Sequence, residues 1–157
     1  MPDRSVEHAT MLIERTLDAP LRRAFAAWSD PALREAPVAD SWDALEHEEF
    51  RVGGEKRMSF GPRSGPRYRE EGRYEDIVPD RRIVYSYSIL RGDVRITTSL
   101  QTIEFVARGP RTQMILTEQL AILDAGDKAA DRERGIGFWL DRFAELLADE
   151  ASARARG

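Results

Sequence analysis

Cysteine is absent from the 157-residue sequence, and histidine occurs only twice. The lack of cysteine excludes disulfides, thiolate catalysis and cysteine metal sites, and it favours a reducing compartment, so we expect a cytoplasmic protein. No apolar run approaches the roughly 20 residues that span a bilayer. Residues 1–15 also lack the apolar segment of a signal peptide. We therefore expect no membrane insertion.

A strong excess of charge is also missing, because the net charge is only −4 and acidic and basic residues are interspersed. Nucleic-acid binding requires a concentrated basic surface, so we expect no nucleic-acid partner. The basic cluster of Arg63, Arg67 and Arg69 is typical of a solvated hairpin loop. The length suits one domain over residues 1–157, with a structured core at about residues 8–148.

Motifs that would identify a reaction are not found. The sequence has no nucleophile elbow, no P-loop and no dinucleotide-binding fingerprint. His47 lies in the acidic run Glu46-His47-Glu48-Glu49, but neighbouring side chains of an extended strand point to opposite faces and cannot converge on one ion. His8 is expected to be exposed at the start of a strand. We expect no metal and no cofactor.

Alternating apolar and β-branched residues predict a series of extended segments. Gly53-Gly54 is interpreted as a tight hairpin turn, since glycine reaches positive φ without penalty. Every connection that joins one predicted strand directly to the next is short, which favours antiparallel pairing of neighbouring strands. The predicted strands are residues 8–16, 42–52, 55–60, 67–78, 83–89, 94–106 and 112–123.

Helical signals follow the first strand and close the chain. Asp18 is predicted to cap a short helix whose first turn contains Pro20. A second short helix is predicted at Pro31–Glu35. The strongest signal covers residues 127–149, where apolar side chains form one wide stripe. Residues 151–157 are expected to form a frayed tail.

This order predicts an α+β fold in which a curved antiparallel seven-stranded sheet wraps around one long C-terminal helix, with two short helices after the first strand. The C-terminal helix is the only long amphipathic element that can cover the sheet. A sheet of this size twists and curls, and one helix is narrower than the concavity. The remaining space is expected to be an apolar cavity suited to a small molecule, unless large side chains such as Phe138 fill it.

A family resemblance appears in segments that follow one another in a characteristic order. They begin with Asp18-Ala19-Pro20 through Asp30-Pro31, continue with Val52-Gly53-Gly54 and the stretch from Gly72 to Pro79, and end with Arg82–Tyr85 and Leu140–Leu147. Together they resemble the START-like (SRPBCC) superfamily, and most closely its bacterial homologues of the heat-shock-protein ATPase activator C-terminal domain (AHSA-type). The resemblance implies a helix-grip fold with a hydrophobic internal cavity, but no particular reaction.

Two departures from the family pattern affect the cavity. Residues 33–37 replace a tryptophan-rich segment, and Gly135-Ile136 stands where relatives often carry Gly-Trp. The resemblance would also put an aromatic or apolar residue at the position of Lys56. A relative's ligand therefore does not carry over.

Strand alternation and the helical stripe together predict which side chains line the cavity. Lys56 and Glu70 would enter from adjacent strands and pair, because an unpaired buried charge is very costly. A register shifted by one residue would instead turn both to solvent. The full set of cavity candidates is Lys56, Met58, Phe60, Tyr68, Glu70, Tyr74, Tyr85, Tyr87, Gln101, Met114, Leu116, Glu118, Ile136, Trp139, Leu140 and Phe143.

Several of these candidates have a second interpretation. Glu118 can reach the cavity or lie in solvent at a strand end. Tyr85 and Tyr87 can orient a ligand through their hydroxyls or serve as core residues. Gln101 shares a polar face with Thr97 and Ser99, which either lines the cavity or faces water.

Three functions remain open at this point. The first is binding of a small hydrophobic or amphipathic ligand without catalysis. The second is an enzyme of the cyclase, hydratase or hydrolase type that uses Lys56, Glu70 or a tyrosine on a hydrophobic substrate. The third, implied by the resemblance alone, is a chaperone-interacting module. An exposed strand edge would also allow a homodimer.

Overall fold

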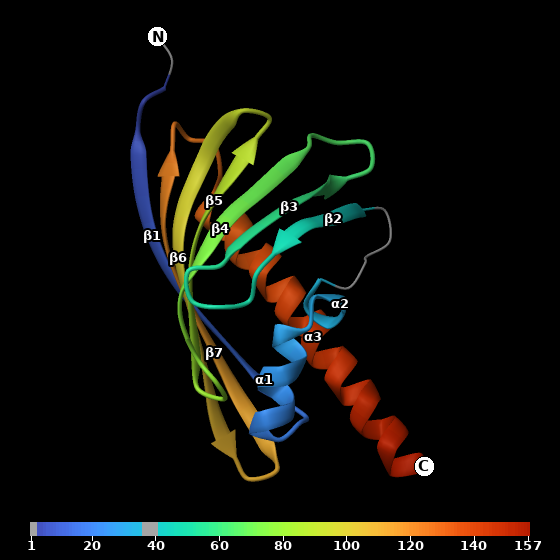
Figure 1. Cartoon of the computed structure of the whole chain (residues 1–157). Coiled ribbons are helices and arrows are strands. Elements are labelled where there is room, and N and C mark those ends of the chain that lie inside the picture. Colours follow the sequence, from blue (N-terminus) through green and yellow to red (C-terminus); the bar gives the residue numbers. More distant parts are fainter. Residues whose placement is uncertain (1–2, 36–40) are drawn as a thin grey trace.

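The computed structural model describes residues 3–35 and 41–157, and it describes side chains for all of these except residues 41–43. Seven strands and three helices follow one another as the sequence predicts (Figure 1). They are β1 (Val6–Leu17), α1 (Leu21–Ser29), α2 (Pro31–Arg34), β2 (Ser41–Glu48), β3 (Glu55–Pro62), β4 (Tyr68–Val78), β5 (Arg82–Arg91), β6 (Val94–Arg108), β7 (Arg111–Leu123) and α3 (Ala129–Arg156). The α+β helix-grip prediction is confirmed.

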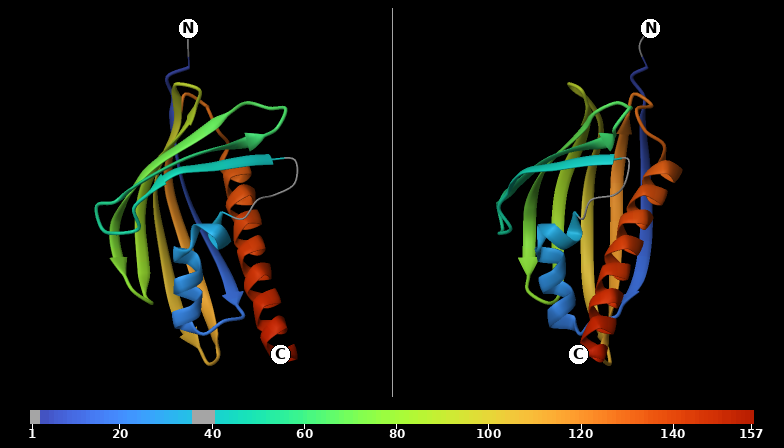
Figure 2. Two further views of the ribbon diagram at one scale, coloured as in Figure 1. Left: turned by 45° about the vertical axis from the view of Figure 1, so that its right-hand side comes forward. Right: turned by 90° about the vertical axis from the view of Figure 1, so that its right-hand side faces the viewer.

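All seven strands form one antiparallel sheet in the order β1-β7-β6-β5-β4-β3-β2. Strands β2 to β7 are a meander, and β1 closes the far edge by pairing with β7. Register shifts interrupt the β2–β3, β4–β5 and β5–β6 pairings, and such irregularities increase the local twist of a sheet. Figure 2 shows the result, a sheet that curves around α3, with α1 and α2 beside α3 on the same side.

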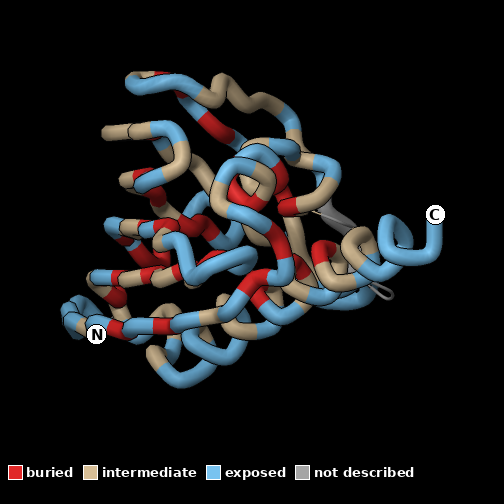
Figure 3. Tube along the Cα trace, turned by 90° about the horizontal axis from the view of Figure 1, so that it is seen from below, coloured by how far each residue is buried: buried red, intermediate tan, exposed pale blue. Residues whose placement is uncertain are grey.

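The core lies between the concave face of the sheet and the helices. In β5, Ile83, Tyr85, Tyr87 and Ile89 are buried while the residues between them are half-exposed, which is the period of two that a half-covered strand requires. The buried stripe of α3 consists of Leu140, Phe143 and Leu147. Buried segments accordingly gather on the inner side of the curved sheet (Figure 3).

Three local predictions are wrong. Asp18 does not cap α1, because Pro20 occupies the N-cap position in an extended conformation, and no side chain caps this helix. The cap appears one helix later, where Asp30 Oδ1 accepts a 3.0 Å hydrogen bond from the Ala32 amide of α2. Asp18 instead lies 4.0 Å from the Arg111 guanidinium.

The second error is the hairpin between β2 and β3. Its strand pairing ends at Glu48 and Lys56, so residues 49–54 form a longer loop than the predicted two-residue turn. The loop folds onto β4, where Gly53 donates to the Tyr74 carbonyl and Tyr74 donates to the Gly54 carbonyl. Gly53 has a φ of 82°, as a glycine can adopt at no steric cost.

The third error is the C-terminal tail, because α3 continues to Arg156. Glu150 receives two hydrogen bonds from Arg23 of α1 and pairs with Arg154 one turn later. Such pairs at helical spacing stabilise a terminal turn. Within the described residues, no helix has both the length and the apolar content needed to cross a bilayer.

Candidate functional site

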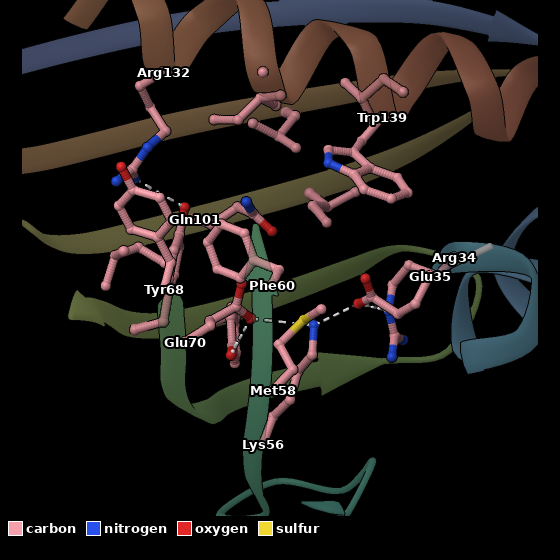
Figure 4. Close-up of a pocket in the computed structure, with 18 of the residues that line it drawn as sticks. Arg34, Glu35, Lys56, Met58, Phe60, Tyr68, Glu70, Gln101, Arg132 and Trp139 are labelled. Carbon is pink, nitrogen blue, oxygen red and sulfur yellow. Dashed lines mark hydrogen bonds and ion pairs between the residues drawn. The ribbon is translucent and has the colours of Figure 1, made fainter. Parts of the chain in front are cut away.

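A pocket of about 340 Å³ lies between the concave face of the sheet and α3. Its walls come from α1, α2, β3 to β7 and α3, so it is built from nearly the whole fold (Figure 4). Most of the predicted cavity residues line it: Lys56, Met58, Phe60, Tyr68, Glu70, Tyr74, Tyr85, Tyr87, Gln101, Leu116, Ile136, Trp139 and Leu140.

The other three candidates point inward but do not line the pocket. Met114 is fully buried in the core cluster. Phe143 packs edge-on against Trp28, with ring centroids 5.1 Å apart. Glu118 is also fully buried, behind Tyr87 and Gln101. An inward direction therefore places a side chain in the core, and only its position along the strand or helix decides whether it meets the pocket.

Lys56 and Glu70 both enter the pocket, so the inward-facing alternative holds. Lys56 is 6% exposed. Its Nζ donates a 2.6 Å hydrogen bond to Glu35 Oε1 and lies 3.1 Å from Glu70 Oε2. The β3–β4 register places Lys56 opposite Gly72, two residues beyond Glu70. Paired residues of neighbouring strands point to the same face of the sheet, and so do residues two apart on one strand. The side chains of Lys56 and Glu70 therefore lie on the same face.

Arg34 of α2 is a second buried cation and contacts the same ion pair through Glu35. Arg34 donates to both carboxylate oxygens of Glu48, at 2.6 and 2.5 Å, and to the Trp28 carbonyl at 2.8 Å. Its Nε donates to Glu35 Oε1 at 3.1 Å, so Glu35 bridges Arg34 and Lys56. Tyr74 donates to the same Glu48 carboxylate. All five charges of the group, which we call the charge cluster, therefore have partners: Arg34, Glu35, Glu48, Lys56 and Glu70.

Sequence reasoning missed Arg34, Glu35 and Glu48. A single helical turn such as α2 is too short to show an amphipathic period, and Glu48 lies in the acidic run at residues 46–49, where no apolar alternation marks an inward face. Other lining residues outside the predicted set are Trp28, Ile83, Ile89, Ile96, Ile103, Gly126, Asp127, Asp131, Arg132 and Gly135. The alternation of β5 and β6 indicates that Ile83, Ile89 and Ile103 face inward, so those three could have been found. Ile96 has the opposite parity to Ile103 and lies at the register shift between β5 and β6.

Within the charge cluster, neighbouring opposite charges favour the charged forms of Lys56 and Glu35. Burial disfavours the ammonium of Lys56, but Glu70 and Glu35 outweigh burial and raise its pKa. Burial likewise disfavours the Glu35 carboxylate, but Lys56 and Arg34 outweigh burial and lower its pKa. A lysine that acts as a base or forms a Schiff base needs a lowered pKa. The direction observed at Lys56 is the opposite, which favours a fixed binding charge.

Tyr85 is held as a hydrogen-bond donor in the same wall. Its hydroxyl donates to Glu70 Oε2 at 2.8 Å. Burial, and then the Glu70 charge, raise the pKa of Tyr85 well above its ordinary value. The ring stacks on Tyr87, with centroids 5.1 Å apart, and Lys56 Nζ lies 5.7 Å from its centroid.

The position of Tyr85 depends on a missing side chain at Gly72. A Cβ at Gly72 would stand 2.2 Å from the Tyr85 hydroxyl oxygen and 2.3 Å from Cζ. The ring cannot move aside freely because Tyr74 and Tyr87 pack against it. Glycine thus makes room for the tyrosine to cross β4 and reach Glu70.

Replacing Gly72 with alanine should destabilise the protein by about 1–3 kcal/mol, the usual cost of overpacking. Chemical denaturation of the variant measures this loss. Gly135→Ala is the control, because no heavy atom lies within 4 Å of its added Cβ and alanine is favoured over glycine within a helix by about 0.5–1 kcal/mol. Equal stability of the two variants would contradict the packing role of Gly72.

A second polar group lies at the β6–β7 side of the pocket. Tyr87 donates to Glu118 Oε2 at 2.9 Å, and Arg132 of α3 donates to Thr97 at 2.7 Å and to Asp127 at 3.1 Å. Glu118 Oε1 is buried and receives no hydrogen bond from the described residues. Burial, only partly offset by Tyr87 and Arg132, raises the pKa of Glu118 to about 7. Among the described residues, no group of His, Asp or Glu side chains is placed to hold a metal ion.

Comparison with protein families places this architecture among known proteins. Residues 18–148 match the family model described as "Activator of Hsp90 ATPase homolog 1-like protein". The chain belongs to this family. The predicted membership of the START-like (SRPBCC) superfamily, in its AHSA-type branch, is thereby confirmed. Among curated proteins, none matches the chain.

Solved structures of bacterial proteins share this fold over most of the chain. An uncharacterized protein from Rhizobium leguminosarum is 39% identical, with a TM-score of 0.85 over 93% of this chain and 98% of that one. The Mll3558 protein from Rhizobium loti is 35% identical, with a TM-score of 0.81 over 91% and 99% of the two chains. Protein CV1439 from Chromobacterium violaceum is 25% identical, with a TM-score of 0.75 over 88% and 96%.

Proposed function

We propose that this AHSA-type protein binds a small amphipathic molecule in the pocket between the sheet and α3. The observation that carries the proposal is an apolar pocket of about 340 Å³ with a paired lysine and carboxylates in one wall. Apolar walls with a few placed polar groups are the common form of small-molecule sites. The fold of the family supports the same function, since its members commonly bind hydrophobic ligands.

The competing functions have less support. An enzyme that uses Lys56 as a base would need a neutral amine, whereas Glu70 and Glu35 keep it charged. A chaperone-interacting role rests on the family's name alone. A homodimer, a cytoplasmic location and the absence of a nucleic-acid partner stay predictions from the sequence.

N-phenylnaphthylamine, a neutral fluorescent probe of apolar cavities, tests the proposal. We expect saturable fluorescence enhancement with one probe per chain. Ile103→Trp should weaken binding about tenfold or more, a loss of about 1.4 kcal/mol, because Ile103 lines the pocket and an indole would occupy ligand space.

Leu100→Trp is the matched control, since Leu100 lies on the same strand but is 39% exposed. It should bind the probe like the unmodified protein. Thermal unfolding of both variants shows whether each remains folded. Absence of enhancement, or equal affinity in the two variants, would contradict binding in this pocket.

A further inference from the structure

We propose that the pocket selects amphipathic cations, in which an apolar or aromatic body carries an ammonium head group beside Glu35 and Glu70. This inference rests on the proposed binding function and names the chemical class of its ligand. It follows from three features of the pocket: its balance of charge, its unused carboxylate oxygens and its aromatic walls.

The charge balance of the pocket is negative. Among the described residues, its lining carries three cations, Arg34, Lys56 and Arg132, against four carboxylates, Glu35, Glu70, Asp127 and Asp131. The charge cluster itself has two cations and three carboxylates. Beside Lys56, a ligand carboxylate would have to displace Glu35 or Glu70 and would meet like charges, which opposes anion binding at this end of the pocket.

The carboxylates beside Lys56 keep one oxygen each for another donor. Lys56 and Arg34 both use Glu35 Oε1, while Lys56 and Tyr85 both use Glu70 Oε2. The described residues donate no hydrogen bond to Glu35 Oε2 or Glu70 Oε1. Both side chains are 16% exposed. Two accessible acceptors thus flank a lysine that is already neutralised.

Aromatic rings form much of the remaining wall. Trp28, Phe60, Tyr68 and Trp139 line the pocket together with the tyrosines of β4 and β5. Phe60 and Tyr68 stack, with centroids 5.6 Å apart and planes 18° from parallel. In Figure 4, Trp139 and Phe60 project into the same space as Glu35 and Glu70. Ring faces carry negative potential and attract cations, so these walls favour the same ligand charge as the carboxylates.

The apolar part of the ligand has its own place. Ile83, Ile103, Leu116 and Leu140 line the pocket from β5, β6, β7 and α3. These side chains offer no hydrogen bonds and exclude water from the body of the ligand. The head group would then lie at the β3–β4 side, where Glu35 follows the end of α2.

Three compounds with one ring system test the charge preference: naphthylmethylamine, naphthylmethanol and naphthoate. Displacement of N-phenylnaphthylamine at about pH 7, where the amine is protonated, gives their affinities. We expect the amine to bind about tenfold more tightly than the alcohol, and the carboxylate to bind most weakly. Equal binding of amine and alcohol, or preference for naphthoate, would overturn the inference while leaving probe binding intact. Failure of every compound and of the probe would contradict the binding function itself.

Substitution of the carboxylates locates the effect. Glu70→Gln should reduce the amine-to-alcohol ratio from about tenfold to about threefold or less. Glu71→Gln is the control, because the neighbouring Glu71 pairs with Arg69 and its side chain is 39% exposed, and it should leave the ratio unchanged. Glu35→Gln serves as a second variant with the same expected loss. An unchanged ratio in both Glu70→Gln and Glu35→Gln would overturn the assignment.

Discussion

Replacement of Lys56 by methionine is expected to destabilise the fold by about 3 kcal/mol, the usual effect of removing one partner from a buried ion pair. The substitution keeps an unbranched side chain of similar length but leaves two carboxylates without their ammonium. Glu35 retains Arg34, whereas the hydrogen bond that Glu70 retains from the described residues comes from the Tyr85 hydroxyl, outside the charge cluster. Urea denaturation compared with the unmodified protein gives the change in the free energy of unfolding.

Two further variants make this result specific. Lys128→Met changes an exposed lysine just before α3, and a surface substitution of this kind should alter stability by less than about 0.5 kcal/mol. The double variant Lys56→Met with Glu70→Gln removes both the ammonium and the carboxylate most dependent on it, so it should recover part of the loss. A loss at Lys56 no larger than that at Lys128 would show that the charge cluster does not stabilise the fold.

Glu118→Gln is expected to stabilise the protein at alkaline pH, by about 3 kcal/mol if each pKa unit is worth about 1.4 kcal/mol. Burial raises the pKa of Glu118 from its ordinary value of 4.5 to about 7. Above the raised value the native protein carries a buried carboxylate whose Oε1 lacks a partner among the described residues. Glutamine removes that charge and can still accept from Tyr87.

The two pKa values of Glu118, in the unfolded and the native protein, set the pH range in which it affects stability. Between about pH 4.5 and pH 7 the unfolded chain has released the Glu118 proton while the native protein retains it. The native state therefore binds more protons, and the Glu118 contribution to stability falls as the pH rises through this range. Well below pH 4.5 both states are protonated, so Glu118→Gln should have little effect there. Arg132, Tyr87, Gln101 and Glu70 surround the group and act in both proteins.

Chemical denaturation at several pH values measures this difference. The stability gap between Glu118→Gln and the unmodified protein should widen steadily from acid to about pH 7 and then remain constant. Glu104→Gln, on an exposed position of β6, should show no such widening. A gap that is constant with pH would mean that the pKa of Glu118 is the same in the native and unfolded protein, so that burial does not raise it.

The strand content and the packing helix were predictable because each has a strong local period. From Ile83 to Ile89, buried and half-exposed residues alternate as the apolar and polar residues of the sequence predict. The buried stripe of α3 consists of Leu140, Phe143 and Leu147, which are spaced as on one face of a helix. The helix caps were harder to predict, because more than one residue of a suitable type precedes the short helices. Asp18 and Asp30 both precede a short helix, and only Asp30 has a backbone amide in reach.

The pocket was predictable in outline for a similar reason. Residue parity along β3, β4 and β5 selects the inward face, and it correctly brings Lys56 and Glu70 together. Parity does not show how far along the element the pocket extends, so Met114 and Phe143 were included although they pack in the core. Arg34 and Glu48 were missed because they meet through the three-dimensional contact of α2 with β2, which has no local pattern.

A crystal structure of the protein with N-phenylnaphthylamine tests ligand binding in the pocket most directly. The expected result is one molecule between the sheet and α3, in contact with Trp139, Ile103 and Leu116, with the Lys56–Glu35 and Lys56–Glu70 pairs intact. A structure in which these side chains close together, while the probe binds only to the outer surface, would contradict a ligand-binding function for this pocket.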